Sequence, residues 1–163
     1  MIQVGVDCEE VARFRKLPYE RKKNFYGKIF TPFEIRYCLS FRDPYPRFAA
    51  RFAAKEAAIK ALNSLSKPTY KEIEIQKDHA GKPVIRVKRD GFRSIKTENL
   101  IIALSITHTR TLAVAFVVIA DRRLIKRDTV RDLLKKSSEH AKRELPERSF
   151  PQSRSKSRHR RLS

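Results

Sequence analysis

Cysteine is scarce in this 163-residue sequence, which contains only Cys8 and Cys38. Two cysteines cannot form a disulfide framework, and neither has a cysteine or histidine neighbour at zinc-ligand spacing, so both are interpreted as packing residues in a reducing compartment. Long apolar runs are also missing: none approaches the roughly 18 residues of a membrane span, and the amino terminus has no basic segment followed by an apolar one. We therefore expect a cytoplasmic, soluble protein.

Two further absences narrow the function. The sequence has no internal repeat, and it has no aromatic RNA-stacking motif of the RNP type. Positive charge, in contrast, is in excess: 38 Lys or Arg against 18 Asp or Glu give a net charge of +20. Such a charge requires a polyanionic partner of one of four kinds, namely nucleic acid, an acidic protein, a phosphorylated ligand or an anionic membrane surface.

The composition changes after residue 120. Residues 1–120 have the apolar content of a single folded domain. Residues 121–163 contain 15 Lys or Arg and 6 Asp or Glu. Within this segment, residues 121–145 are expected to form a highly charged helical extension, whereas residues 146–163 lack the apolar content for order and are expected to be a basic, disordered tail.

The first half of the domain is predicted to be mainly helical. Residues 2–7 have strand character and end on a carboxylate, and a helical pattern follows over residues 8–17. At residues 31–34, TPFE combines a threonine N-cap, a proline at the first helical position and a glutamate three residues after the cap, which is the pattern of a capping box. After a turn at residues 43–46, an alanine-rich helix is expected to end near residue 63.

The second half of the domain has the alternation of β-structure. EIEIQ and VIRVK flank a turn that contains glycine, so residues 72–88 are predicted to form a β-hairpin. Two apolar strands are predicted at residues 100–108 and 112–120. We expect these four strands and the amino-terminal strand to form one mainly antiparallel sheet with helices on one face, which is an α+β fold.

Three charged residues stand in the middle of the alanine-rich helix: Lys55, Glu56 and Lys60. Because charged side chains are rarely buried without a partner, Glu56 should be paired, and Lys60 at the i+4 position is the local candidate for an ordinary salt bridge. Asp7 has a similarly simple interpretation as the N-cap of the helix that follows it. His108, taken alone, is typical of a turn histidine.

Together, these residues lie in a pattern that resembles a known family. VGVD at residues 4–7, RFAAKEA at residues 51–57 with Lys60 beyond it, GKP at residues 81–83 and SITHT at residues 105–109 are similar to the holo-acyl-carrier-protein synthase type of 4′-phosphopantetheinyl transferase. RFAAKEA is the most specific match, and the order and spacing of the shorter motifs agree with it. The resemblance covers residues 1–120 and implies the fold of that family.

The resemblance implies transfer of phosphopantetheine from coenzyme A to a serine hydroxyl of an apo acyl carrier protein, with release of adenosine 3′,5′-bisphosphate, a reaction of fatty acid biosynthesis. It also implies Mg²⁺ bound by Asp7, Glu56 and the coenzyme A pyrophosphate, because Mg²⁺ takes one or two carboxylates, substrate phosphates and waters. Such an ion would stabilise the charge that develops at the attacked phosphorus. On this interpretation, the alanines let ligand and metal come close to the helix.

The same resemblance assigns roles to four catalytic residues. Glu56, directly or through a metal-bound water, is the candidate base for the serine proton, and Asp7 is a metal ligand only. Lys60 places a cation on the pyrophosphate. His108 contacts coenzyme A phosphates, where a hydrogen-bond donor would stabilise the same developing charge.

Coenzyme A and the carrier protein have further expected contacts. Arg51 matches the family arginine that binds the 3′-phosphate, a role suited to a bidentate guanidinium, and Gly81, Lys82 and Pro83 match the turn beside the adenine. Arg13 matches the arginine that docks the acidic helix of the carrier. The basic residues near it form either a wider steering field or a solvated basic face: Arg15, Lys16, Arg21, Lys22 and Lys23.

Small members of the family form trimers, in which Asp7 and His108 of one chain are expected to meet the Glu56 helix of a neighbour. Ala50 stands where a glycine commonly precedes the family arginine, and its methyl group is expected to crowd the nucleotide. The alternative function is that of a basic nucleic-acid-binding protein that contacts phosphates through the Arg- and Lys-rich tail. That alternative explains the net charge but not the two acids.

Overall fold

The computed structural model describes residues 1–63, 65, 67–87 and 99–124. The elements are, in order, β1 (Ile2–Glu10), α1 (Val11–Arg15), the 3₁₀ helix η1 (Tyr19–Arg21), α2 (Lys23–Ile29), α3 (Pro32–Leu39), α4 (Tyr45–Leu62), β2 (Ile73–Lys77), β3 (Pro83–Val87), β4 (Leu100–His108), β5 (Leu112–Asp121) and the 3₁₀ helix η4 (Arg122–Leu124). Beyond residue 124, the predicted charged helix and basic tail lie outside the described residues. Within the described ranges, no helix is long and apolar enough to cross a membrane.

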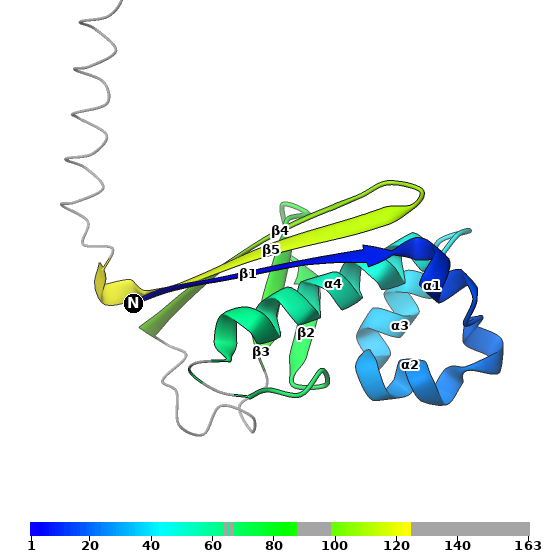
Figure 1. The fold of residues 1–163 in the computed structure, drawn as a ribbon, viewed down its shortest axis with the longest axis horizontal. Helices are drawn as coiled ribbons and strands as arrows, with labels where there is room; N and C mark the ends of the chain where they lie inside the picture. The colour runs from blue at the N-terminus through cyan, green and yellow to red at the C-terminus, as the bar shows by residue number, and fades with distance from the viewer. Residues whose placement is uncertain (64, 66, 88–98, 125–163) are drawn as a thin grey trace, which may run out of the picture. The chain divides into compact units, whose positions relative to one another are not determined.

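The strands form two antiparallel sheets (Figure 1). In the first, β5 lies between β1 and β4; in the second, β2 pairs with β3. The α+β class and the hairpin are confirmed, but the prediction of one five-stranded sheet is wrong for the described strands. Among the described residues, the hairpin joins the main core through apolar side chains such as Ile73 and Ile75, and not through backbone hydrogen bonds to the larger sheet.

Small residues let α4 pack tightly along one face of the three-stranded sheet (Figure 1). At Gly5 of β1, an added Cβ atom would lie 1.9 Å from the carbonyl oxygen of Ala57, so only glycine fits there. The alanines of α4 fill the main core against inward side chains of β5 such as Val117 and Ile119. Most of the alanines thus bring a sheet close to the helix. The interpretation that they admit a ligand and a metal stays a prediction.

A second core surrounds the first turns of α4 and is rich in aromatic rings. Phe14, Tyr26, Phe30 and Phe48 contact one another with ring centroids 4.6–6.3 Å apart. Isolated helices as short as α1 and α2 are unstable, so this tertiary packing stabilises them. The sequence pattern did not predict α2, and it placed the start of α1 three residues too early because β1 continues to Glu10.

The capping box predicted at the start of α3 is confirmed. Thr31 Oγ1 accepts the Glu34 N–H at 3.3 Å, and Glu34 Oε2 accepts the Thr31 N–H at 2.8 Å. The same carboxylate also has a partner that the sequence did not suggest, because Lys55 Nζ of α4 lies 2.8 Å from Glu34 Oε2. Both side chains are fully buried. The ion pair therefore connects α3 to α4 in the interior.

Lys55 also fixes the chain that leads into β2. Its ammonium group donates to the carbonyl oxygens of Tyr70 and Ile73, at 2.7 and 2.5 Å, so all three of its N–H groups have an acceptor. Glu34 Oε1 accepts the backbone N–H of Ile75 at 2.9 Å. Burial lowers the pKa of Lys55, and the charge of Glu34 opposes this effect. The pair is satisfied on every side, as a buried charge requires.

The tight contact at Gly5 can be tested by substitution. Gly5→Ala is expected to lower the free energy of unfolding by about 1–3 kcal/mol, because β1 must move away from α4. Gly27→Ala is the matched control, since a Cβ atom there meets nothing within 4 Å and alanine stabilises a helix by about 0.5–1 kcal/mol over glycine. Urea unfolding measures both, and an unchanged Gly5→Ala variant would contradict the tight contact.

Candidate active site

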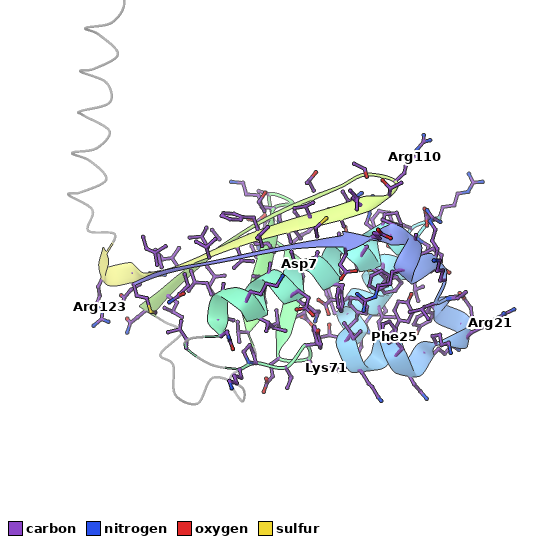
Figure 2. All side chains as sticks on the ribbon, in the orientation of Figure 1. Asp7, Arg21, Phe25, Lys71, Arg110 and Arg123 are labelled. Atoms are coloured by element: carbon purple, nitrogen blue, oxygen red, sulfur yellow. The ribbon has the colours of Figure 1, made fainter. Side chains whose placement is uncertain are left out.

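The acidic part of the site begins on β1, which continues three residues beyond Asp7. The residue at the N-cap position of α1 is Glu10, whose side chain makes no capping hydrogen bond. The N-cap interpretation of Asp7 is therefore wrong. Because side chains alternate along a strand, Asp7 faces the same side as Gly5, toward α4. Figure 2 shows Asp7 where β1 passes α4.

Lys60 of α4 is the partner of Asp7. Its Nζ lies 2.8 Å from Asp7 Oδ1 and 3.0 Å from the carbonyl oxygen of Val6. The Asp7 side chain is only 14% exposed, and its other oxygen, Oδ2, is buried without a hydrogen-bond partner in the part of the chain that the structure describes. An unpaired buried carboxylate oxygen is costly, so Oδ2 is well suited to bind a cation or a donor from a ligand.

Glu56 lies one helical turn before Lys60, but the two do not form the local ion pair predicted as the simple alternative. Glu56 Oε1 accepts a hydrogen bond from the hydroxyl of Tyr70, while Lys60 contacts Asp7. The charges remain close: the pKa of Lys60 is raised first by its hydrogen bond to Asp7, and the charges of Glu56 and Glu9 raise it further. The structure thus brings Asp7, Glu56 and Lys60 together in one chain.

The sequence analysis missed two members of this group, Glu9 and Tyr70. Glu9 follows Asp7 by two positions on the same side of β1, a spacing that could have identified it. Burial raises the pKa of Glu9, the Arg13 guanidinium opposes this effect, and the charges of Asp7 and Glu56 add to it. Burial, together with the hydrogen bond to Glu56, raises the pKa of Tyr70 to about 12. Tyr70 lies between α4 and β2, where no periodic pattern could reveal it.

Arg13 of α1 lies beside the acidic group, which consists of Asp7, Glu9 and Glu56. Its guanidinium is 2.9 Å from Glu9 Oε1 and stands over the ring of Phe52, 5.0 Å from the centroid. Half of the Arg13 side chain is exposed. Arg15 on the same helix pairs with Asp43 at 2.5 Å. The other basic residues of the predicted docking field are also exposed: Lys16, Arg21, Lys22 and Lys23.

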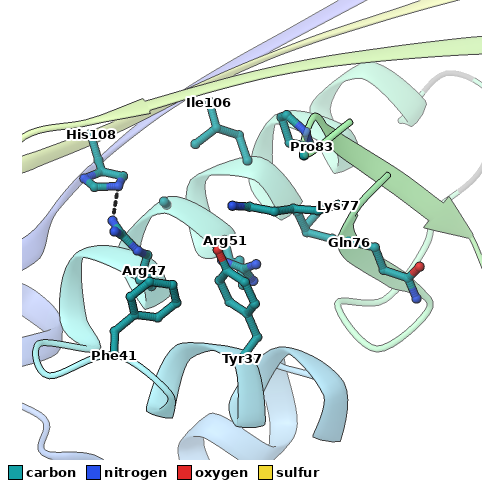
Figure 3. A pocket seen from close by; sticks show the side chains of 12 residues that line it. Tyr37, Phe41, Arg47, Arg51, Gln76, Lys77, Pro83, Ile106 and His108 are labelled. Atoms are coloured by element: carbon teal, nitrogen blue, oxygen red, sulfur yellow. Dashed lines mark hydrogen bonds between the residues drawn. The ribbon is translucent and has the colours of Figure 1, made fainter. Parts of the chain in front are cut away.

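A cavity of about 290 Å³ adjoins another face of α4 (Figure 3). It brings together four residues predicted to bind coenzyme A: Arg51, Gly81, Pro83 and His108. Two other residues predicted to bind coenzyme A do not line the cavity: Lys82 is exposed in the same turn as Gly81, and Lys60 contacts Asp7. Sequence reasoning missed the remaining polar lining, which comes from Tyr37, Arg47, Gln76 and Lys77. Ala50 lines the cavity as well, and the expected crowding of a nucleotide by its methyl group stays a prediction.

Arg51 is the most buried cation of the cavity. It is 5% exposed, and its Nε has no hydrogen-bond partner among the described residues. Its guanidinium lies 3.8 Å from the centroid of the Tyr37 ring, which holds it by a cation–π contact. A guanidinium with an unpaired Nε–H inside a cavity is suited to bind a phosphate.

His108 and the glycine turn complete the cavity. His108 Nε2 contacts the Arg47 guanidinium, and burial, followed by the charge of Arg47, lowers the pKa of His108. The lowered pKa favours the neutral ring, which keeps one N–H donor. In the turn, Gly81 has a φ of +80°, which glycine adopts without strain. Asp78 Oδ1 fixes the turn by accepting the Lys82 N–H at 2.9 Å.

The acidic group and the cavity occupy different faces of α4. Arg47 and Arg51 are four residues apart and share one face, whereas Glu56 is turned from Arg51 by about 140°. Asp7 contacts Lys60 on α4 of its own chain. Within the same chain, His108 also contacts α4 through Arg47. The expected contacts of Asp7 and His108 with the Glu56 helix of a neighbouring chain stay a prediction.

The acidic group fits a magnesium ion that arrives with a phosphorylated substrate. Among the described residues, no cluster of three or more His, Cys, Asp or Glu is arranged to hold a metal. Among the described residues, Asp7 has one buried oxygen without a partner, and Tyr70 engages one oxygen of Glu56. Two carboxylates, completed by substrate phosphates and water, are the usual contribution of a protein to such a site.

Comparison with known proteins identifies relatives of this chain. Residues 3–117 match the 4′-phosphopantetheinyl transferase superfamily. The holo-[acyl-carrier-protein] synthase of Halothermothrix orenii is 40% identical over 117 residues, which cover 71% of this chain and 94% of the relative. That of Thermodesulfovibrio yellowstonii is 42% identical over 116 residues, which cover 71% and 96%. These matches give no support to the alternative nucleic-acid-binding function.

Solved structures of holo-acyl-carrier-protein synthases are similar in fold. The Bacillus anthracis structure, in complex with coenzyme A (3′,5′-ADP), has a TM-score of 0.58 and 29% identity, and the match covers 72% of this chain and 94% of that one. The Neisseria meningitidis structure has a TM-score of 0.65 and 28% identity, and the match covers 74% and 100%. This chain therefore belongs to the 4′-phosphopantetheinyl transferase superfamily, and within it to the holo-acyl-carrier-protein synthase type.

Proposed function

We propose that this protein transfers 4′-phosphopantetheine from coenzyme A to a serine hydroxyl of an apo acyl carrier protein, in a magnesium-dependent reaction that serves fatty acid biosynthesis. The observation that best supports this proposal is the Oδ2 atom of Asp7, which is buried beside Lys60 and Glu56 and has no hydrogen-bond partner among the described residues. A site with this acid group would repel a pyrophosphate unless a cation joined the two. The match over residues 3–117 supports residues 1–120 as the transferase domain. A cytoplasmic location stays a prediction.

The cavity beside α4 is proposed to hold the nucleotide end of coenzyme A. The Arg51 guanidinium, whose Nε–H is unpaired among the described residues, would bind the 3′-phosphate, and His108 would donate a hydrogen bond to a phosphate oxygen. The turn at Gly81 and Pro83 would lie beside the adenine, with the Tyr37 ring on the opposite wall holding Arg51 in place.

The reaction is an in-line displacement at the phosphorus atom that carries the pantetheine arm. The serine oxygen forms the new bond to this phosphorus, the bond to the bridging pyrophosphate oxygen breaks, and adenosine 3′,5′-bisphosphate leaves with that oxygen. Glu56 accepts the serine proton. Lys60, 52% exposed, would exchange its contact with Asp7 for one with the pyrophosphate. Mg²⁺ held by Asp7 and Glu56 would neutralise the charge that develops on the phosphoryl oxygens.

Arg13 is proposed to dock the acidic carrier. Arg13 stands at the surface beside Glu9. An acidic side chain of the carrier protein bound to Arg13 would therefore lie next to the proposed catalytic residues. The exposed cations of η1 and the start of α2 extend the same positive surface: Arg21, Lys22 and Lys23. A field of this kind accelerates the encounter with an acidic protein and weakens as salt is added.

The outer face of the three-stranded sheet supports a homotrimer. Its residues on β1 and β5 include exposed apolar side chains: Ile2, Val4, Val6, Leu112 and Phe116. Val6 pairs with Phe116 in the register of β1 and β5, so the apolar side chains are neighbours across the strands. An uncovered apolar face of this extent is typical of an interface between copies. Assembly would also let the nucleotide cavity of one copy face the acidic group of another.

Intact-mass spectrometry of an apo acyl carrier protein tests the transfer. Incubation with this protein, coenzyme A and Mg²⁺ is expected to add one phosphopantetheine group, and a chelator is expected to prevent the addition. Glu56→Gln and Asp7→Asn should each lower the rate at least about 100-fold while the fold is kept, since each removes a carboxylate proposed to bind Mg²⁺, and Glu56→Gln also removes the proposed base for the serine proton. Glu10→Gln, on the opposite side of β1, is the matched control and should keep full activity. A fully active Glu56→Gln variant would refute the role of Glu56.

Substrate comparison tests the nucleotide cavity. Arg51→Met is expected to raise the KM for coenzyme A by about 10- to 100-fold, because the variant loses the charge-assisted hydrogen bonds from the guanidinium to the 3′-phosphate. The variant should also lose the preference for coenzyme A over 3′-dephospho-coenzyme A. Arg36→Met, an exposed arginine of α3 outside the cavity lining, should change neither quantity. A preference that survives in Arg51→Met would place the 3′-phosphate elsewhere.

Light scattering coupled to size exclusion tests the assembly. The unmodified protein is expected to elute as a trimer, and Phe116→Lys should dissociate it because three charges would be buried at the proposed interface. Phe33→Lys changes a similarly exposed aromatic residue on α3 and should leave the trimer intact. A monomeric unmodified protein with full transferase activity would contradict the shared site.

A further inference from the structure

We propose that Tyr70 is a positioning residue for Glu56: its hydroxyl fixes one carboxylate oxygen and so directs the other toward metal and substrate. This inference rests on the proposed transferase function. Tyr70 comes from the segment between α4 and β2, outside the motifs that resemble the family. Among the described residues, neither Arg51 nor Lys60 forms a hydrogen bond with Tyr70. The geometry around Tyr70 carries the proposal.

The hydroxyl of Tyr70 donates a hydrogen bond to Glu56 Oε1. The acceptor is a carboxylate, so the bond is charge-assisted and stronger than one between neutral groups. A glutamate on a helix has three rotatable side-chain bonds, and without a partner its carboxylate would sample several orientations. With Oε1 engaged by Tyr70, the orientation of Oε2 is fixed as well, because the carboxylate is planar.

The protein holds Tyr70 from two other sides. Its ring stacks on Phe52, with the centroids 5.7 Å apart and the planes 26° from parallel. Its carbonyl oxygen accepts the Lys55 ammonium at 2.7 Å. Lys55 is the neighbour of Glu56 on α4 and is itself fixed by Glu34 in the core. The backbone, the ring and the hydroxyl of Tyr70 are therefore all attached to the helix that carries Glu56.

Packing alone does not account for the hydroxyl. A phenylalanine would keep the stacking on Phe52, and the contact with Lys55 uses the backbone, which every residue has. The hydroxyl adds a polar atom to a half-buried site, where it must find an acceptor to offset its desolvation. Its acceptor is the proposed catalytic carboxylate. Partners of this kind around metal-binding carboxylates typically change activity by about 10- to 100-fold.

Tyr70→Phe is the decisive variant, and kinetics with an apo acyl carrier protein provide the first measurement. We expect kcat to fall by about 10- to 100-fold while both KM values change by less than about twofold, since binding groups stay in place. Tyr26→Phe is the matched control: its hydroxyl donates to the Leu17 carbonyl oxygen at 2.9 Å in the aromatic core. It should lower the melting temperature and leave kcat unchanged.

Proton NMR provides a second measurement that is independent of activity. The Tyr70 hydroxyl proton, held by a carboxylate, should give a downfield resonance that is absent in Tyr70→Phe and moves upfield in Glu56→Gln, where the acceptor is neutral. If this resonance is absent from the unmodified protein, or if Tyr70→Phe keeps its kcat, the positioning role is refuted while transfer by the unmodified protein stands. If the unmodified protein transfers nothing, the proposed function fails and the positioning role fails with it.

Discussion

The contact between Gly5 of β1 and Ala57 of α4 sets the position of the proposed catalytic residues Asp7 and Lys60. A strand can approach a helix this closely only where neither side carries a large side chain, and here even one methyl group at residue 5 would overlap the helix backbone. Asp7 follows two residues later on the same side of β1, and Lys60 follows Ala57 by nearly one helical turn. The close contact of Gly5 with Ala57 therefore brings Asp7 Oδ1 within 2.8 Å of Lys60 Nζ.

Neighbouring residues of α4 have opposite surroundings, and the rotation of the helix explains why. Lys55 points into the core, where Glu34 and two carbonyl oxygens satisfy it. Glu56 is rotated by about 100° and reaches the acidic group at the surface of the core. A shift of one residue in the packing of α4 would bury an unpaired carboxylate and expose the ammonium, at a cost of several kcal/mol. The buried ion pair thus keeps Glu56 in register with Asp7.

Local patterns predicted the elements, and only tertiary contacts revealed their partners. The capping box at Thr31, the hairpin, the strand at residues 100–108 and the alanine-rich helix could be predicted, because each depends on residues close together in the sequence. The Glu34–Lys55 pair and the Tyr70–Glu56 bond could not, because they join segments brought together by packing. The same limit produced the error at Asp7: the cap interpretation assumed that the strand ended there.

The acidic group is a small region of negative charge in a protein of net charge +20. Asp7, Glu9 and Glu56 raise the pKa of Lys60 together, and Arg13 offsets Glu9. Each proposed substrate is itself an anion and can pair with a cation that neutralises a carboxylate in the free protein. The pyrophosphate would pair with Lys60 in place of Asp7, and the carrier would pair with Arg13 in place of Glu9. Either exchange leaves a carboxylate without its partner, which strengthens the attraction for a divalent cation. Carboxylates that are paired with Lys60 and Arg13 in the free enzyme would in this way be released to bind a metal ion once both substrates are bound.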